Sequence, residues 1–170
     1  PWIDLSTGIN PLAYPVVDVA ARTWARLPGR DEERALIDAA ARRYGCPADK
    51  IIAAPGTQAL IQILPRLIAR SRVAILGPTY AEHEASWRRH GHAVSVVPQL
   101  ADAAEADVVV AVNPDNPTGR LLSSDALRGV QARFLVVDEA FIDFLPAEAS
   151  LAGDLPDNAV VLRSFGKTYG

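Results

Sequence analysis

The chain has 170 residues, of which 49% are hydrophobic, and its formal net charge at pH 7 is −3. A chain of this size can bury one substantial core, and the lack of a basic cluster argues against a nucleic-acid-binding surface. The single cysteine, Cys46, excludes an internal disulfide. With no signal peptide and no apolar run of about 18 residues, we expect a soluble cytoplasmic protein. Because the chain starts at Pro1 and contains no methionine, we expect it to be part of a longer protein.

The opening segment, residues 6–15, carries two prolines, a glycine and an asparagine, which predicts an irregular loop. Apolar residues at helical spacing then predict helices over Val16–Leu27, Asp31–Tyr44, Thr57–Ile68, Ala81–His90 and Ser123–Val130. Short apolar runs predict strands over Ile51–Ala54, Arg72–Gly77, Ala93–Val97, Val108–Asn113, Phe134–Asp138 and Val160–Ser164. Pro65 falls inside one predicted helix, where it clashes with the carbonyl of Ile61 and should bend or end the helix.

The predicted strands are apolar on both faces, which indicates an α/β fold with a mostly parallel sheet covered by helices. In such sheets, ligands bind beyond the carboxyl ends of the strands. The polar clusters of the chain follow these ends, at Pro55–Gln58, Pro78–Tyr80, Asn113–Gly119, Asp138-Glu139 and Ser164–Lys167. The sequence therefore predicts one site at this edge of the sheet.

Two of these clusters have the composition of ligand-binding turns. Gly56 lets the backbone approach an anion, and the N–H groups of Thr57 and Gln58 can bind a phosphate at a helix start, although an ordinary helix cap explains the same residues. In Asn113–Gly119, two Asn-Pro steps impose a rigid path and fix both asparagine side chains. Asn116 can then donate to a phenolate oxygen or reach a substrate carboxylate, whereas the simpler interpretation is a chain reversal.

Lys167 and Asp138 each follow the end of a buried strand. A lysine that forms an imine and a carboxylate that keeps a pyridine nitrogen protonated together indicate pyridoxal phosphate as cofactor. Tyr80 can stack on its ring, or it is simply an aromatic residue in a surface loop. Gly166-Lys167-Thr168 also matches the end of a phosphate-binding P-loop, but that motif needs a glycine where this chain has Val161.

The remaining candidate groups receive no chemical role. His83, His90 and His92 show no metal-ligand spacing, and His90-Gly91-His92 is interpreted as a structural helix-to-strand turn, so we expect no metal site. Cys46 has no basic partner nearby in the sequence, so no reactivity is assigned to it.

Together the motifs resemble the fold-type I pyridoxal-phosphate enzymes, in the branch of the histidinol-phosphate aminotransferases. Asn113–Gly119, Asp138–Phe141 and Ser164–Lys167 carry this resemblance. Asp4–Pro11 and Ala54–Gln58 are most similar to the threonine-phosphate decarboxylases of cobalamin biosynthesis. The resemblance implies an N-terminal arm and substrate-covering loop over residues 1–30 and an incomplete cofactor-binding large domain over 31–170, with the C-terminal small domain absent from this chain.

By the same resemblance, Lys167 would form the imine with pyridoxal phosphate and shuttle protons. Asp138 would pair with the pyridine nitrogen, Asn116 with the ring hydroxyl, and Tyr80 would stack on the ring. Thr57, Gln58 and Ser164 would hold the phosphate, beside Gly56. Gly8, Ile9 and Asn10 would lie over a small phosphorylated amino-acid substrate, and the family implies a homodimer without nucleic-acid or membrane partners.

Two residues depart from the aminotransferase pattern. Phe141 stands where a tyrosine often contacts the ring oxygen, and Leu27 stands where a tyrosine often reaches the partner subunit's phosphate. Two arginines that family members carry further along, one for the phosphate and one for the substrate carboxylate, are not in this chain. The expected reaction is decarboxylation of L-threonine O-3-phosphate, and the choice between losing the carboxylate and losing the Cα proton depends on which bond stands perpendicular to the ring.

Other functions remain open on the sequence alone. A histidinol-phosphate or related aminotransferase would exchange a keto acid instead of releasing carbon dioxide. A regulator with an aminotransferase-like domain would only sense the cofactor. An unrelated α/β binding protein would show no imine absorbance with pyridoxal phosphate.

Overall fold

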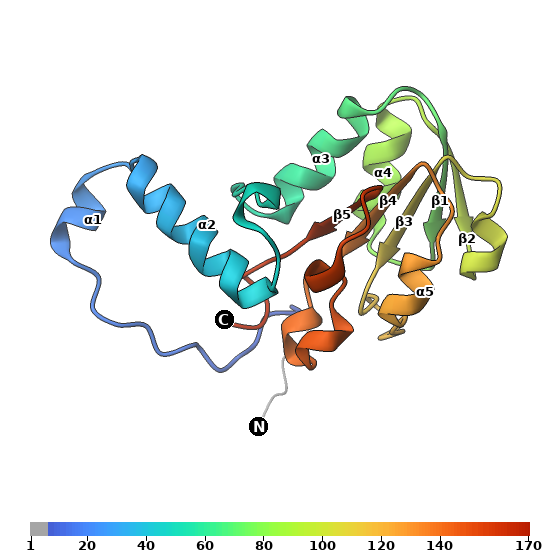
Figure 1. The fold of residues 1–170 in the computed structure, drawn as a ribbon. Helices are drawn as coiled ribbons and strands as arrows, with labels where there is room; N and C mark the ends of the chain where they lie inside the picture. The colour runs from blue at the N-terminus through green and yellow to red at the C-terminus, as the bar shows by residue number, and fades with distance from the viewer. Residues whose placement is uncertain (1–6) are drawn as a thin grey trace.

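The computed structural model describes residues 7–170. Its centre is a sheet of five parallel strands in the order β2-β1-β3-β4-β5 (Figure 1). The strands are β1 (Arg72–Leu76), β2 (Ala93–Val97), β3 (Val108–Val112), β4 (Phe134–Asp138) and β5 (Ala159–Leu162). Valine and isoleucine dominate them, as expected of strands buried on both faces. The predicted parallel α/β sheet is confirmed. The Asp4–Ser6 part of the opening motif lies outside the described residues.

Helices surround this sheet. In the described part of the chain the α-helices are α1 (Ala21–Ala25), α2 (Arg30–Tyr44), α3 (Thr57–Leu67), α4 (Ala81–Arg89) and α5 (Ser124–Arg128). Short 3₁₀ helices cover Ala48–Lys50, Leu100–Ala103, Ile142–Phe144, Ala147–Ala149 and Ala152–Asp154. No helix among residues 7–170 is long and apolar enough to cross a membrane.

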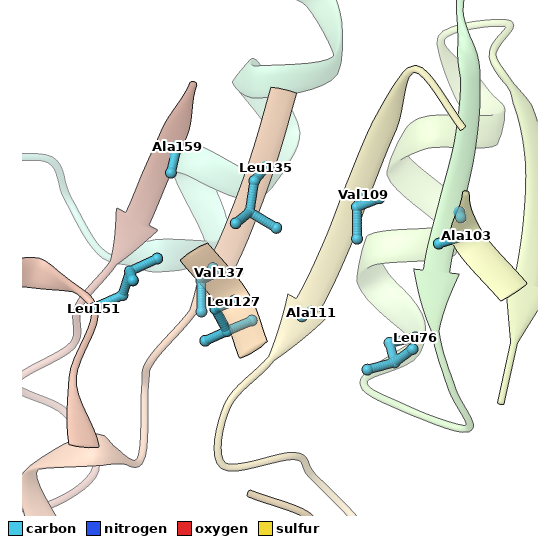
Figure 2. Packing of buried hydrophobic residues seen from close by; sticks show 10 residues of the cluster. Leu76, Ala103, Val109, Ala111, Leu127, Leu135, Val137, Leu151 and Ala159 are labelled. Carbon is cyan, nitrogen blue, oxygen red and sulfur yellow. The ribbon is translucent and has the colours of Figure 1, made fainter. Parts of the chain in front are cut away.

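Both faces of the sheet are covered, because successive side chains of a strand point to opposite faces. On one face, Ile61 of α3 and Trp87 of α4 pack against strand residues such as Ile75 and Val110. On the other face, Leu127 of α5 and Leu151 pack against the intervening strand residues. Figure 2 shows this second cluster, which contains Ala74, Leu76, Ala103, Val109, Ala111, Leu127, Leu135, Val137, Leu151 and Ala159.

Pro65 is accommodated within α3, which continues to Leu67. A proline cannot donate the usual hydrogen bond to the carbonyl four residues earlier, which here belongs to Ile61. The hydroxyl of Ser86 on α4 donates to that carbonyl at 2.9 Å. The proline therefore creates an acceptor inside the molecule, and a neighbouring helix satisfies it.

The predicted strand over Ile51–Ala54 is wrong. These residues are irregular, and Ile52 is 85% exposed. The segment is short and apolar, which is the pattern of a buried strand, but it pairs with no strand of the sheet. The missing backbone partner explains the failure, because a strand is defined by its pairing and not by its own residues.

The predicted helix over Val16–Leu27 is mostly wrong. Only Ala21–Ala25 is helical, and residues 16–20 have no regular structure. Val16, Val17 and Leu27 are between 82% and 90% exposed. A short helix rich in β-branched residues is unstable unless it packs against another surface, and these side chains pack against none in the part of the chain that the structure describes.

Candidate functional site

The side chains predicted from strand ends do come from neighbouring strands. Tyr80 follows β1, Asn116 follows β3, Asp138 is the last residue of β4, and Lys167 follows β5. Strands β1, β3, β4 and β5 are consecutive in the sheet and parallel, so their carboxyl ends share one edge. The fold thereby brings residues that are far apart in the sequence to one edge.

Asp138 is nine-tenths buried, and its carboxylate has two partners. Its Oδ2 lies 2.9 Å from Nε2 of His83, which is itself buried in α4, and its Oδ1 accepts a hydrogen bond from the backbone N–H of Ala140 at 3.1 Å. Nε2 of His83 donates to this carboxylate, which has only acceptor atoms when ionised. The partnership offsets the cost of burying the carboxylate and fixes its orientation.

His83 is a functional candidate that the sequence reasoning missed. The sequence around His83 shows no metal-ligand spacing, and its hydrogen-bond partner Asp138 lies 55 positions away in the sequence. A weak signal was present, because His83 follows Tyr80 by three residues and so lies on the same side of the helix. The two rings meet edge to face with centroids 6.2 Å apart.

The start of α3 has no side-chain cap. Gly56 precedes the helix with φ of 86° and ψ of 157°, and no atom lies within 4 Å of the position where a Cβ would be. Gly56 brings no side chain to cap the first turn, so the helix N-terminus is open to an anion at Thr57 and Gln58. The Gln58 side chain is already engaged, since its Nε2 donates to Glu82 at 3.0 Å and its Oε1 accepts from Tyr80 at 3.4 Å.

The Asn113–Gly119 loop holds one asparagine and leaves the other exposed. The side-chain amide of Asn113 pairs with both backbone groups of Leu122, at 2.8 and 3.1 Å. The Asp115 carboxylate accepts from the hydroxyl and the backbone N–H of Thr118. Asn116 is exposed and makes no hydrogen bond within residues 7–170. The expectation that both asparagine side chains are fixed is therefore right for Asn113 and wrong for Asn116, because a proline restrains the backbone before it but not the side chain.

Lys167 lies in a turn that the opening segment covers. Its Nζ is 5.7 Å from the centroid of the Phe141 ring. The backbone N–H of Asn10 donates to the Lys167 carbonyl, and Nδ2 of Asn10 donates to the Thr168 carbonyl, both at 2.8 Å. Ser164 begins the same turn, where its hydroxyl accepts from the backbone N–H of Gly166 at 3.2 Å.

Gly8 lies against the ring of Phe141, which Nζ of Lys167 also faces. A Cβ on Gly8 would lie 2.9 Å from Cζ of Phe141, which is closer than real contacts allow. A larger residue at this position would therefore have to displace the Phe141 ring. Ile9, between Gly8 and Asn10, is 45% exposed. The opening loop thus lies against Phe141 and the Lys167 turn.

The other histidines have backbone partners. Nδ1 of His92 accepts from the N–H of Ser71 at 3.2 Å, so its Nε2 carries the proton and donates to the Pro65 carbonyl at 2.9 Å. Nδ1 of His90 lies 2.8 Å from the Ser86 carbonyl. The structural interpretation of the His90-Gly91-His92 turn is confirmed. Within residues 7–170, no three or more His, Cys, Asp and Glu side chains group as metal ligands do.

Among curated relatives, the chain is 44% identical over 180 residues to the threonine-phosphate decarboxylase of a Sinorhizobium species. It is 40% identical over 181 residues to that of Pseudomonas aeruginosa. Both alignments cover 99% of this chain but 54% and 53% of the relatives, so the chain spans about half their length. A histidinol-phosphate aminotransferase of Mycobacterium tuberculosis is 36% identical over 156 residues, covering 85% of this chain and 43% of that protein.

Solved structures and a family model agree with these relatives. The L-threonine-O-3-phosphate decarboxylase from Porphyromonas gingivalis superposes with a TM-score of 0.71 at 26% identity, over 81% of this chain and 48% of that one. The histidinol-phosphate aminotransferase from Sinorhizobium meliloti, solved in complex with pyridoxal-5'-phosphate, gives 0.69 at 26% identity, over 88% and 46%. The model for aminotransferase class I and II matches residues 1–170. The chain therefore belongs to the aminotransferase class I and II family.

Proposed function

We propose that the complete protein is a pyridoxal-phosphate-dependent lyase that decarboxylates L-threonine O-3-phosphate to aminopropanol phosphate, a step of cobalamin biosynthesis. The observation that carries this proposal is the 40–44% identity to threonine-phosphate decarboxylases across 99% of the chain. The similarity to a histidinol-phosphate aminotransferase is lower, at 36%, and covers 85% of the chain. Phe141 supports the same choice, since it lacks the hydroxyl that the aminotransferases often carry there.

The residues at the carboxyl edge fit pyridoxal phosphate. Asp138 is a buried carboxylate held by His83, which suits a protonated pyridine nitrogen. The N-terminus of α3, which has no side-chain cap and is preceded by Gly56 with a positive φ, suits a phosphate. Lys167 supplies the primary amine that the aldehyde needs, and the chain has only one other lysine, Lys50. When bound, the cofactor supplies an electron-accepting ring that makes cleavage of a bond at the substrate's Cα feasible.

Each residue then has a specific task. Nζ of Lys167, which lies 5.7 Å from the centroid of the Phe141 ring, would hold the cofactor through its aldehyde and would accept and return a proton at the reacting centre. Asp138 holds a proton on the pyridine nitrogen, and His83 holds Asp138. Asn116 donates to the ring oxygen from a loop that Asn113 and Asp115 fix.

Three further groups of residues bind the cofactor or cover the substrate. Thr57, Gln58 and Ser164 bind the phosphate, with Gln58 acting through its backbone N–H because its side chain already bonds Glu82 and Tyr80. Tyr80 stacks on the cofactor ring. Gly8, Ile9 and Asn10 lie over the substrate and exclude water from it, and the bonds from Asn10 to the Lys167 turn support this role.

Released carbon dioxide tests the proposed reaction. The complete protein, loaded with pyridoxal phosphate and supplied with L-threonine O-3-phosphate, is expected to release one carbon dioxide for each aminopropanol phosphate formed. Formation of a keto acid without carbon dioxide would establish the alternative, an aminotransferase acting on histidinol phosphate or a related amine. Because the chain is 36% identical to a histidinol-phosphate aminotransferase, histidinol phosphate is the comparison substrate.

We also propose that the complete protein works in the cytoplasm as a homodimer, with residues 1–30 as an arm and residues 31–170 as the incomplete large domain. The arm exposes apolar side chains that nothing in the described chain covers, namely Leu12, Val16, Val17, Trp24 and Leu27. Exposed apolar patches of this kind mark interfaces. Sedimentation of the complete protein should give a dimer, and Val17→Asp with Leu27→Asp should shift it to monomer. A monomeric wild type would contradict the assignment.

A further inference from the structure

A second group of buried charges lies next to the Lys167 turn and has no part in the site described above. We call it the Arg163 cluster; it consists of Arg43, Tyr44, Glu139, Asp143, Ser150 and Arg163. Glu139 is fully buried, and the side chains of Asp143 and Arg163 are 3% and 11% exposed. Buried charges are costly unless each has partners, so their presence here needs an explanation.

The guanidinium of Arg163 joins two carboxylates and an aromatic ring. Its Nη1 lies 3.2 Å from Oε2 of Glu139, and its Nη2 lies 2.6 Å from Oδ1 of Asp143. Its Cζ lies 4.3 Å from the centroid of the Tyr44 ring. Glu139 is further held by the hydroxyl of Ser150 at 2.6 Å. A planar fork with two carboxylates and a stacked ring is an arrangement that only arginine can make.

The cluster connects the two strand ends that carry the site residues. Asp138 and Leu162 are partners in the β4–β5 register, and the N–H of Glu139 donates to the Leu162 carbonyl at 2.8 Å. Glu139 therefore directly follows Asp138, while Arg163 precedes Lys167 by four residues. A bond between Glu139 and Arg163 fixes the path of both exits at the point where they leave the sheet.

Helix α2 contacts the Arg163 cluster through Arg43 and Tyr44 of its last turn. Tyr44 lies against Arg163, which precedes Lys167, and Nη2 of Arg43 bonds Oδ1 of Asp143 at 3.1 Å. Ala40 is the one buried residue that α2 contributes, so this helix attaches to the body chiefly through its last, polar turn.

We propose that Arg163 is a positioning residue, which through Glu139, Asp143 and Tyr44 holds the Lys167 turn in a fixed place relative to Asp138. It does not touch the reacting atoms. Its effect is to keep Nζ of Lys167 within reach of a ligand whose opposite end Asp138 holds, and a displacement of about 1 Å is enough to slow such a reaction strongly. The part that concerns the cofactor rests on the proposed function, whereas the effect on the turn itself does not.

Arg163→Lys tests this inference in the complete protein, with Arg128→Lys as its matched control. Arg128 also bridges two carboxylates, Asp125 and Asp154, but it lies on α5, away from the turn. Two quantities are measured. One is the rate at which Lys167 captures pyridoxal phosphate, read from the Lys167 peptide after borohydride reduction. The other is amide hydrogen exchange at Asn10 and Tyr14, whose N–H groups donate to the carbonyls of Lys167 and Tyr169.

We expect Arg163→Lys to slow capture roughly tenfold or more and to speed exchange at Asn10 and Tyr14 by a similar factor, with exchange in β3 unchanged. Arg128→Lys should change neither quantity. If Arg163→Lys does not fold, Tyr44→Leu replaces it, because that variant leaves every charge paired and should shift both quantities in the same direction. Wild-type exchange at Asn10 and Tyr14 in a folded variant would overturn the inference. Failure of the wild type to capture the cofactor would instead contradict the proposed function, and the exchange result would still decide the role of Arg163.

Discussion

Asp138 and Glu139 are adjacent, acidic and buried, yet they have different surroundings. Asp138 faces α4, where the His83 ring holds one of its two carboxylate oxygens. Glu139 is surrounded by hydrogen-bond donors from Ser150, Leu151 and Arg163. The Asp138 carboxylate accepts two hydrogen bonds, whereas the Glu139 carboxylate accepts three, one of them from a charged guanidinium. The difference separates a residue prepared for a ligand from one that holds the framework.

The cause lies in the geometry of an extended chain. Successive side chains of a strand point to opposite faces, so Asp138 and Glu139 leave β4 in opposite directions. Asp138 meets the layer that contains α3 and α4, and Glu139 meets the segment around Leu151, which packs on the other face. Two neighbouring residues with similar chemistry can therefore serve different purposes.

The largest effect is expected at the framework carboxylate. Glu139→Ala leaves the buried Arg163 without one of its carboxylates, and removing one partner of a buried pair costs about 3–5 kcal/mol. Urea unfolding of the complete protein should show this loss in the free energy of unfolding. A fall in the free energy of unfolding of less than about 1 kcal/mol, which is typical of an exposed ion pair, would contradict a framework role for Glu139.

A smaller and different effect is expected at the ligand-facing carboxylate. Asp138→Asn keeps the size of the side chain and an oxygen for His83, but removes the negative charge that would hold a proton on the cofactor ring. Turnover should fall roughly a hundredfold or more, because a preorganised charge at the reacting group is lost. Urea unfolding of the apoprotein should change far less than in Glu139→Ala. Equal loss of stability and wild-type turnover would reverse the roles assigned here.

The pH dependence of stability sharpens the same contrast. Burial raises the pKa of Glu139 above its ordinary value of 4.5, and hydrogen bonds from Ser150, Leu151 and Arg163 only partly oppose it. Between 4.5 and the raised pKa, the folded state binds more protons than the unfolded state, so the free energy of unfolding falls as pH rises through that window. Urea unfolding across this range should show a smaller fall in Glu139→Gln. An unchanged slope in that variant would contradict this origin.

The smallest effect is expected for the exposed counterpart of the cluster. Arg128→Ala removes contacts with Asp125 of α5 and with Asp154 of the 3₁₀ helix Ala152–Asp154, whose side chains are 89% and 82% exposed. Exposed ion pairs contribute about 0–1 kcal/mol, so urea unfolding should barely change. A loss as large as that of Glu139→Ala would show that burial is not what distinguishes the two arginines.

Local patterns in the sequence predicted the strands that pair with one another in the central sheet. The five strands that pair in the sheet, and the polar residues that follow them, were found because runs of valine and isoleucine suit a sheet buried on both faces. Ile51–Ala54 and Val16–Leu27 are also rich in apolar residues, but within residues 7–170 Ile52, Val16, Val17 and Leu27 stay exposed. Composition indicates what a segment can form, and only the rest of the fold decides whether it does.

His83, Glu139 and Arg163 were harder to predict because their roles depend on long-range contacts. His83 bonds Asp138 across 55 positions, and Arg163 bonds Glu139 across 24. Neither spacing matches a local motif, since the contacts arise from the order of strands in the sheet and from the packing of α4 and α2. Asp138 and Lys167 could be found because Asp138 ends an apolar strand and Lys167 lies in the turn after another.

The central claim is that Lys167 is the residue that binds pyridoxal phosphate. The direct measurement is borohydride reduction of the complete protein with the cofactor, followed by mass analysis of the lysine peptides. Lys50 is the internal control, since it lies in an exposed pair with Asp157 at 3.9 Å. The account predicts the added mass on the Lys167 peptide, retained in Lys50→Ala and lost in Lys167→Ala. Added mass at Lys50, or no added mass at either lysine, would contradict it.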